Sequence, residues 1–167
     1  LQVPPTVVLT NGDNTTTLTT MDTVSPFDYD WVVDPSTANG TWTAPSGVYN
    51  VTVELWGGGA GGSTGPTGGQ SSRGGGGGGG GAYVNGWLAV TPGITYNVTV
   101  GPAVSGAVAG QGSNVVGDGS VTLTANGGST VATSRTGGAG GTTSSGSNVI
   151  ASFAGGAGGT AGGTASW

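Results

Sequence analysis

Apolar and polar residues alternate along several short segments of the chain. Residues 48–56, VYNVTVELW, carry apolar side chains at every second position, namely Tyr49, Val51, Val53 and Leu55. Residues 94–100 repeat this pattern with Ile94, Tyr96, Val98 and Val100. A period of two residues is typical of a β-strand with one buried face. Further, less regular strands are expected at residues 82–90, 120–125, 129–133 and 147–153.

The spacing of the expected strands indicates the fold class. No segment carries the 3.6-residue period of an amphipathic helix, so we expect almost no helix. Turn sequences such as TPG at 91–93 and GDG at 117–119 separate the strands. Short strands with frequent turns favour an all-β, antiparallel, jelly-roll-like β-sandwich, which we place at residues 39–167.

Residues 1–38 have a different composition from the rest of the chain. They hold five of the seven acidic residues and one glycine. The segments TVVLT (6–10) and TTTLTT (15–20) flank the turn sequence NGDN, which predicts a β-hairpin. We therefore expect an N-terminal arm or attachment module. Its acidic residues Asp28, Asp30 and Asp34 lack EF-hand spacing and fit a solvated strand edge better than a metal site.

Glycine tracts separate the strands, at residues 57–69, 74–81, 137–141 and 155–163. Residues 74–81 are eight consecutive glycines that run directly into an expected strand. A flexible linker is one interpretation, but a linker joins domains, whereas this tract lies between two strands of one core. A phosphate-binding loop is a second interpretation. It requires a following helix and, in the Walker type, a lysine, which the chain lacks.

A packed polyglycine array is the third interpretation. Extended chains with three residues per turn can lie side by side only where no Cβ intervenes. Ordering glycine is costly in backbone entropy, so such an array requires many neighbouring strands. We expect long glycine-rich loops in the polyglycine II conformation. The sequence leaves open whether one chain supplies enough strands or borrows neighbours from other subunits.

Composition excludes several classes of function. The chain has a net charge of −5, no lysine, histidine or cysteine, and only two arginines, Arg73 and Arg135. Without a basic patch, nucleic-acid binding is not expected, and no apolar run is long enough for membrane insertion. The missing side chains also exclude a Ser-His-Asp triad, a Cys-His pair and a Schiff base. We predict no catalytic residues, no cofactor and no metal.

The motifs of residues 41–101 resemble the glycine-rich domain at the ends of bacteriophage tail fibres and adhesins. NGTWTAPSGVYNVTVELWGGGAGGS leads through polyglycine to AYVNGWLAVTPGITYNVTVG. The matching positions are Trp42, Thr43, Pro45, Gly47, Trp56 to Gly59, Ala82, Tyr83, Thr91 to Gly93, Thr95, Tyr96 and Val98 to Gly101. The likeness covers about residues 40–163. It implies a virion surface protein that is often trimeric, with loops that touch a host receptor in some members.

We therefore expect a non-enzymatic virion surface protein, either a fibre-tip adhesin or a capsid decoration protein. Its partners would be itself, as a homotrimer or larger assembly, other virion proteins, and a host-surface glycan or protein. The expected receptor-facing loop contains Thr64, Pro66, Thr67, Gln70, Ser71, Ser72 and Arg73. Expected subunit contacts are Val7, Val8, Leu9 and Trp167.

Two further expectations concern assembly and the aromatic residues. An extracellular filament assembled by N-terminal strand exchange is the alternative function. The five tryptophans are Trp31, Trp42, Trp56, Trp87 and Trp167. Those at strand starts and ends are expected to cover the sandwich core rather than to stack on sugars, and Trp167 is the exception.

Overall fold

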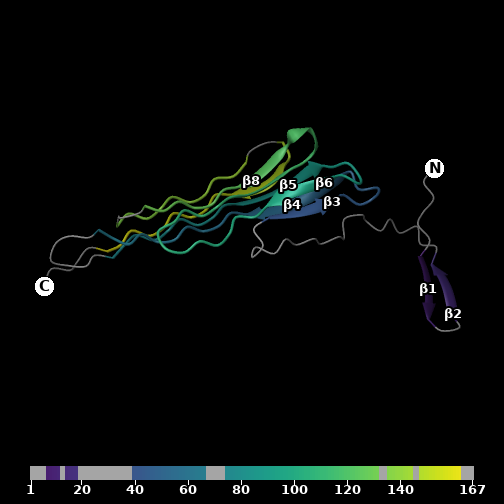
Figure 1. The fold of residues 1–167 in the computed structure, drawn as a ribbon, viewed down its shortest axis with the longest axis horizontal. Helices are drawn as coiled ribbons and strands as arrows, with labels where there is room; N and C mark the ends of the chain where they lie inside the picture. Colours follow the sequence, from purple (N-terminus) through teal and green to yellow (C-terminus); the bar gives the residue numbers. More distant parts are fainter. Residues whose placement is uncertain are drawn as a thin grey trace. The chain divides into compact units, whose positions relative to one another are not determined.

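The structure is a computed structural model that describes residues 7–11, 14–18, 39–66, 74–131, 135–144 and 147–162. The chain divides into two units, Leu1–Trp31 and Val32–Trp167. In the first unit, β1 (Val7–Asn11) and β2 (Asn14–Leu18) pair antiparallel as a two-stranded sheet (Figure 1). The hairpin predicted from the β-branched runs is confirmed.

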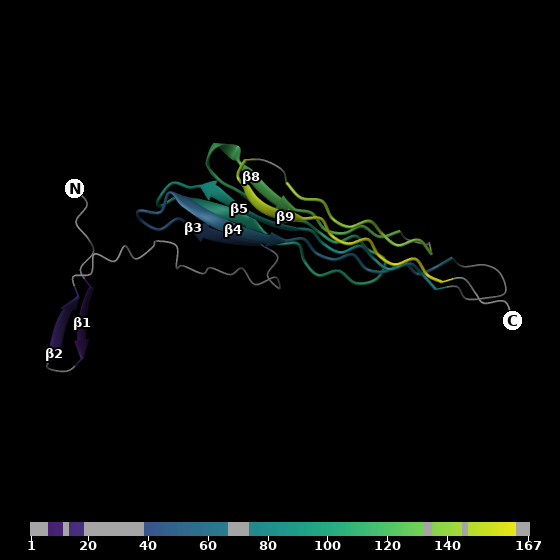
Figure 2. The same ribbon diagram turned by 180° about the vertical axis from the view of Figure 1, so that it is seen from behind.

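The second unit contains a β-sandwich of two antiparallel sheets (Figures 1 and 2). The four-stranded sheet has the order β3 (Asn39–Thr43), β6 (Thr95–Thr99), β7 (Ser113–Val116), β8 (Thr122–Ala125). The three-stranded sheet has the order β4 (Asn50–Trp56), β5 (Tyr83–Ala89), β9 (Val149–Phe153). The described residues contain no α-helix, only the single 3-10 turn η2 (Asp118–Ser120), so the predicted all-β sandwich is confirmed.

Side chains from both sheets form the main hydrophobic core. Its buried members are Leu55, Val84, Leu88, Val115, Leu123 and Ala125. The alternation predicted for β4 places Leu55 in this core and packs Val51 and Val53 against it. The prediction is wrong at Tyr49 and Ile94, which are 64% and 49% exposed. Both residues precede the first paired position of their strands, so the opposite sheet does not cover them.

Two strand assignments also need correction. No strand is predicted at residues 101–119, but this segment contains β7, whose four residues are too few to show a period. The weak strand predicted at 129–133 is wrong over residues 129–131, which are not in a β-strand. Residues 132–133 lie outside the described part of the chain. The hydrogen bonds of Ser129 instead join it to the glycine tracts, where a different period applies.

Candidate interaction site: the glycine bundle

Six extended glycine-rich tracts lie side by side and continue from the sandwich (Figures 1 and 2). We number them in chain order as tract 1 (57–66), tract 2 (74–82), tract 3 (107–112), tract 4 (126–131), tract 5 (135–142) and tract 6 (154–162). Backbone hydrogen bonds join neighbouring tracts at N···O distances near 2.9 Å, for example from Ala60 to Gly79, Gly138 to Gly77 and Gly158 to Gly138. These six tracts together are called the glycine bundle.

Tract 2 lies inside the bundle and contacts four other tracts. Its Gly76 and Gly79 carbonyls accept from tract 1, and its Gly77 and Gly80 carbonyls accept from tract 5. The Gly77 and Gly80 amides donate to tract 6. The Gly79 amide and that of Ala82 donate to tract 4. Each neighbour is therefore met at every third residue, which is the period of a polyproline II helix.

The space around tract 2 explains why its inward-facing residues are glycines. A Cβ on Gly78 would come closer than 3.0 Å to the carbonyl oxygen of Ala60 in tract 1. A Cβ on Gly79 would come equally close to the Ala139 carbonyl in tract 5. A Cβ on Gly80 would lie 3.3 Å from the Gly156 nitrogen in tract 6. Three successive residues thus face three different backbones, and at each of them a Cβ would come closer than ordinary van der Waals contact.

The hydrogen bonds arrange the six tracts in two layers. Tracts 1, 2 and 6 form the first layer, in that order, and tracts 3, 4 and 5 form the second. The first layer extends from β4, β5 and β9, so its order repeats the order of the three-stranded sheet. In the second layer, tract 3 leads into β7 and tract 4 follows β8. The bundle therefore continues the sandwich with backbone contacts in place of side-chain contacts.

A buried serine links the sandwich to the bundle. The Ser113 hydroxyl donates to the carbonyl of Trp56 at 2.6 Å and accepts from the amide of Gly101 at 3.0 Å. Ser113 is 2% exposed, and its two partners lie where β4 and β6 give way to glycine-rich segments. The prediction of a packed array is thus confirmed, because one chain supplies the four tracts that contact tract 2.

The end of the bundle remote from the sandwich brings three tracts together. The backbones of Ala161 and Arg135 are joined by an amide-to-carbonyl hydrogen bond of 2.8 Å, and the Arg135 Nη2 donates to the Ala161 carbonyl at 3.0 Å. A Cβ on Gly74 would lie 3.6 Å from the Cβ of Ala161. We call this region the tip. Its contacts join the start of tract 2, the start of tract 5 and the end of tract 6.

The predicted receptor loop leaves the bundle at this tip. Thr64 and Pro66 are exposed at the end of tract 1. The other predicted loop residues, Thr67, Gln70, Ser71, Ser72 and Arg73, lie outside the described residues, as does Trp167. Val7, Val8 and Leu9 lie in β1, opposite Leu18, Thr17 and Thr16 of β2.

An exposed row of aromatic side chains crosses the three-stranded sheet, and the sequence did not predict it. The ring centroids of Trp56 and Tyr83 are 5.3 Å apart, and those of Tyr83 and Phe153 are 6.0 Å apart. Trp56 is 61% exposed, Phe153 66% and Trp87 44%. The expectation that Trp56 and Trp87 cover the core is wrong, because they alternate with the buried Leu55 and Leu88 and so face outward. Trp42 does pack against a second cluster of buried residues, Ala44, Val90 and Tyr96.

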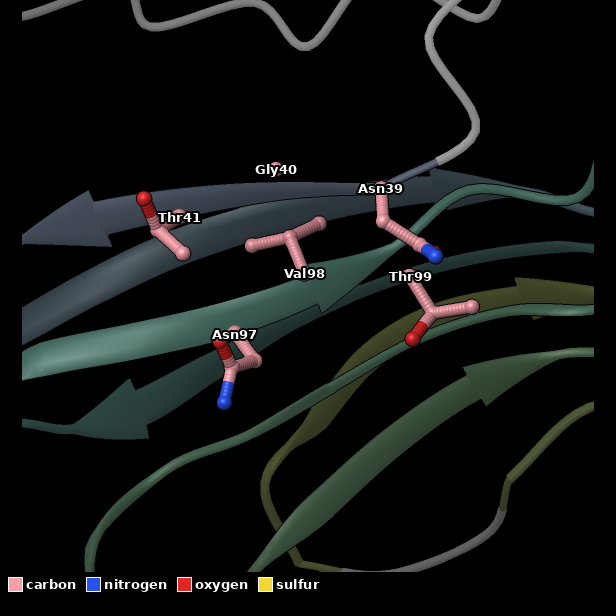
Figure 3. A pocket seen from close by; sticks show the side chains of 6 residues that line it. All are labelled: Asn39, Gly40, Thr41, Asn97, Val98 and Thr99. Carbon is pink, nitrogen blue, oxygen red and sulfur yellow. The ribbon is translucent and has the colours of Figure 1, made fainter.

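A shallow hollow lies over the paired strands β3 and β6 (Figure 3). It has a volume of about 400 Å³, and it is lined by Asn39, Gly40, Thr41, Asn97, Val98 and Thr99. None of these side chains titrates in the physiological range, so the lining supplies no acid, base or nucleophile activated by a neighbour.

Asp118 belongs to a hydrogen-bonded cluster at the opposite end of β5 from the bundle. Its Oδ1 accepts from the Tyr96 hydroxyl at 2.6 Å and its Oδ2 from the Thr91 hydroxyl at 2.7 Å. These bonds, that of Tyr96 first, lower the pKa of Asp118 below its ordinary value of 3.8. Burial, followed by the bond to Asp118, raises the pKa of Tyr96 above 10.0. Both carboxylate oxygens hold the η2 turn in place, which is a structural role.

The described segments contain neither a metal-binding cluster nor a membrane-spanning helix. No three acidic residues there come together as a metal-binding group. No helix within the described ranges is long and apolar enough to cross a membrane. Glu54, the acidic residue of β4, accepts a hydrogen bond from the Asn85 side chain at 3.3 Å on the exposed side of the sheet.

Comparison with known proteins identifies one family. A family model described as a glycine-rich domain (Gly_rich_2) matches residues 35–167, which include the sandwich and the whole bundle. No curated protein matches the sequence. The match confirms the glycine-rich domain expected from the motifs and carries no information about a phage or an adhesin.

Proposed function

Because the chain belongs to the family of glycine-rich domains, we propose that it is a non-enzymatic surface protein of a bacteriophage particle. In this role it takes part in host attachment or in stabilising the particle, at the virion surface. The observation that supports the proposal best is the glycine bundle. A bundle held by backbone hydrogen bonds is a stiff support, and the described ends of tracts 2, 5 and 6 come together at the tip.

The tip fits a receptor-binding role better than any other described surface. Binding residues commonly lie on loops that a rigid scaffold holds in place. Tract 1 ends there in the exposed Thr64 and Pro66, and the predicted loop continues through Gln70 and Arg73. We propose a host-surface glycan or protein as the partner of this loop, with other virion proteins and further copies of the chain as partners elsewhere.

The N-terminal hairpin suits attachment to the rest of the particle. β1 and β2 pair only with each other among the described strands, and an isolated two-stranded hairpin is marginally stable in water. Pairing with a strand of another protein would stabilise it. The same observation keeps the alternative function open, in which residues of β1 such as Val7 and Leu9 join the next subunit of an extracellular filament.

Immunoelectron microscopy tests the proposed location. Antibodies against the purified chain are applied to phage particles from a culture that carries the gene. Labelling at the tail end or on the capsid is the expected result and separates the two kinds of virion protein. Label on long filaments without particles would favour the alternative, and removing residues 1–20 should then abolish filament assembly. Label confined to the cell interior would contradict both proposals.

Adsorption measurements test the tip. The variant Gln70→Ala/Arg73→Ala should slow adsorption of phage to host cells, because it truncates the two longest side chains of the predicted loop. Asn97→Ala in the hollow over β3 and β6 serves as a matched control, since it truncates an exposed polar residue far along the chain from the tip. Equal adsorption by the loop variant and the control would contradict the assignment of the loop.

A further inference from the structure

The outer surface of the first layer is made largely of glycine. Among the twelve exposed residues of tracts 1, 2 and 6, seven are glycines: Gly59, Gly62, Gly74, Gly77, Gly156, Gly159 and Gly162. We call these seven residues the glycine face. A Cβ on Gly156, Gly159 or Gly162 would meet nothing within 4 Å, and one on Gly59 would meet only the Gly79 oxygen at 3.9 Å. Packing among the described residues therefore does not require glycine at these four positions.

The second layer provides an internal comparison. Tracts 3, 4 and 5 have nine exposed residues, and none of them is glycine: Val108, Ala109, Gln111, Asn126, Ser129, Val131, Thr136, Ala139 and Thr142. In this layer, glycine occupies only positions that are not exposed, such as Gly128 and Gly138. Glycine costs more backbone entropy on folding than any other residue. Exposed glycines on the first layer alone are therefore not explained by packing within the bundle.

Some backbone amides and carbonyls of tract 2 have no hydrogen-bond partner among the described residues, and they indicate why the first layer exposes glycine. In a chain with three residues per turn, successive amides point about 120° apart. The amides of Gly77 and Gly80 donate to tract 6, and that of Gly79 donates to tract 4. The third set of positions in this threefold repeat consists of Gly75, Gly78 and Gly81. Neither the amides nor the carbonyls of this third set make a backbone hydrogen bond to any described residue.

The direction of this third set follows from the positions of the four neighbours. Tracts 6, 5, 4 and 1 follow one another around tract 2, as their mutual hydrogen bonds require. A hexagonal array of parallel rods gives each interior rod six neighbours, so two adjacent positions between tracts 1 and 6 are not filled by any described residue. The threefold repeat directs the Gly78 amide to one of these positions and the Gly78 carbonyl to the other. The amides of Gly59 and Gly159 also lack a described partner and line the same side.

The exposed aromatic row lies next to the glycine face. Trp56 directly precedes tract 1, Tyr83 directly follows tract 2, and Phe153 directly precedes tract 6. The row is therefore at the boundary where the three-stranded sheet becomes the first layer. Large exposed aromatic side chains mark interaction surfaces and supply much of the binding energy in protein interfaces. This observation is independent of the glycine positions, and it points to a partner on the same layer.

We propose that the glycine face and the aromatic row together form an interface with a second copy of this chain. The partner must offer extended strands with a three-residue repeat, unpaired amides and carbonyls at that repeat, and no side chains in the contact. The first layer of another copy meets all three requirements. Two first layers facing each other across a two-fold axis form an isologous dimer, in which each copy fills the vacant positions beside the other's tract 2.

Packing inside the chain supports this layer-on-layer contact. The second layer already stacks on the other side of the first layer through bonds such as Gly138 to Gly77 and Gly128 to Gly58. Tracts 1 and 2 run antiparallel and tracts 2 and 5 run parallel, so strands of either direction fit the array. A glycan stacked on the aromatic row would explain Trp56 and Phe153, but it would leave the bare glycines of tract 6 unexplained.

Sedimentation velocity of the full chain over a range of concentrations tests the proposal. The wild type should sediment as a dimer, and Gly156→Val/Gly159→Val should weaken association about tenfold or more, because two branched side chains would hold the layers apart. Ala139→Val is the matched control, since it adds bulk at an exposed position of the second layer. It should associate as tightly as the wild type. Melting curves at a concentration where all three proteins are monomeric should coincide within error.

Three outcomes would overturn the proposal. One is a wild-type chain that stays monomeric up to about 1 mM. The second is a Gly156→Val/Gly159→Val variant that associates as tightly as the wild type, which would place the interface elsewhere, for example on the N-terminal hairpin. The third is a Trp56→Ala variant with unchanged association, which would separate the aromatic row from the interface. None of these outcomes depends on whether the protein belongs to a phage particle.

Discussion

The sandwich and the glycine bundle are built from adjoining segments of one chain but follow opposite packing rules. In the sandwich, branched side chains such as Leu123 and Val84 fill the space between two sheets and are fully buried. At the inward-facing positions of the bundle, the backbones approach until no space is left for a Cβ, and hydrogen bonds replace apolar contacts. The sandwich therefore tolerates little loss of volume, and the bundle tolerates little gain.

The two regions also differ in what stabilises them. Burying apolar surface contributes about 25 cal/mol per Å². A bundle of glycine gains little from this term, and a typical backbone hydrogen bond contributes only about 0.5–1.5 kcal/mol net. The ordering entropy of glycine works against the bundle. Its dense network of bonds between tracts, and its continuity with the two sheets, are the features that offset this cost.

Removing volume from the sandwich should produce the largest effect. Leu123→Ala deletes most of a fully buried side chain at the centre of the core. We expect the free energy of unfolding to fall by about 3 kcal/mol, from lost apolar burial and from the cavity left behind. Urea unfolding followed by tryptophan fluorescence measures this loss. A loss below about 1 kcal/mol would show that the sandwich core is not the main source of stability.

Adding volume inside the bundle should produce the next largest effect. Gly79→Ala places a Cβ closer than 3.0 Å to the carbonyl oxygen of Ala139. The atoms that this Cβ meets all belong to the backbone, so no side chain can rotate away to make room. We expect a loss of about 2 kcal/mol, as for overpacked cores, in the same urea experiment. A flexible loop would instead be stabilised slightly by alanine, because alanine has less freedom than glycine in the unfolded chain. An increase in stability would therefore contradict the packed bundle.

The hydrogen-bonded cluster around Asp118 should show its effect through pH. Because folding lowers the pKa of this carboxyl group, its contribution to stability is complete above the ordinary value of 3.8 and is lost as the pH falls through the lower folded value. Asp118→Asn should lower the melting temperature at neutral pH and flatten its decline in acid. Melting curves between about pH 2 and pH 6 test this. Parallel curves for the two proteins would show that Asp118 does not contribute.

A methyl group on the glycine face should have the smallest effect on the folded monomer. A Cβ on Gly156 would meet no atom within 4 Å. We expect Gly156→Ala to change the free energy of unfolding by no more than about 0.5 kcal/mol in either direction. The measurement is made by urea unfolding at a concentration low enough to exclude self-association. A loss as large as that of Gly79→Ala would mean that tract 6 is packed on both sides within one chain.

The sequence predicts the strands of the sandwich better than it predicts which side chains are exposed. A period of two residues marks β4 and β6 because one face of each strand meets the core. The four residues of β7 are too short for this signal, and the alternation at Tyr49 and Ile94 extends beyond the region that the opposite sheet covers. Period-two patterns report burial, so they identify strands reliably only where a second sheet lies opposite.

The bundle could be anticipated from the glycine content, but its arrangement could not. Eight identical residues carry no period, so the sequence of tract 2 does not reveal which neighbour each glycine faces. Only the structure shows that Gly78, Gly79 and Gly80 face three different tracts. The alternation in β4 already places Trp56 on the face opposite Leu55, whereas Trp87 lies inside β5, whose less regular pattern carries no clear signal.

Amide hydrogen exchange along tract 2, followed by NMR in the Gly156→Val/Gly159→Val variant, tests the packed bundle most directly. The amides of Gly77, Gly79, Gly80 and Ala82 donate to neighbouring tracts and should exchange slowly. Those of Gly75, Gly78 and Gly81 have no described acceptor and should exchange quickly, which gives a repeat of three residues. Uniformly fast exchange from Gly74 to Ala82, as in a flexible loop, or an alternation with a period of two, as in a β-strand, would contradict the account.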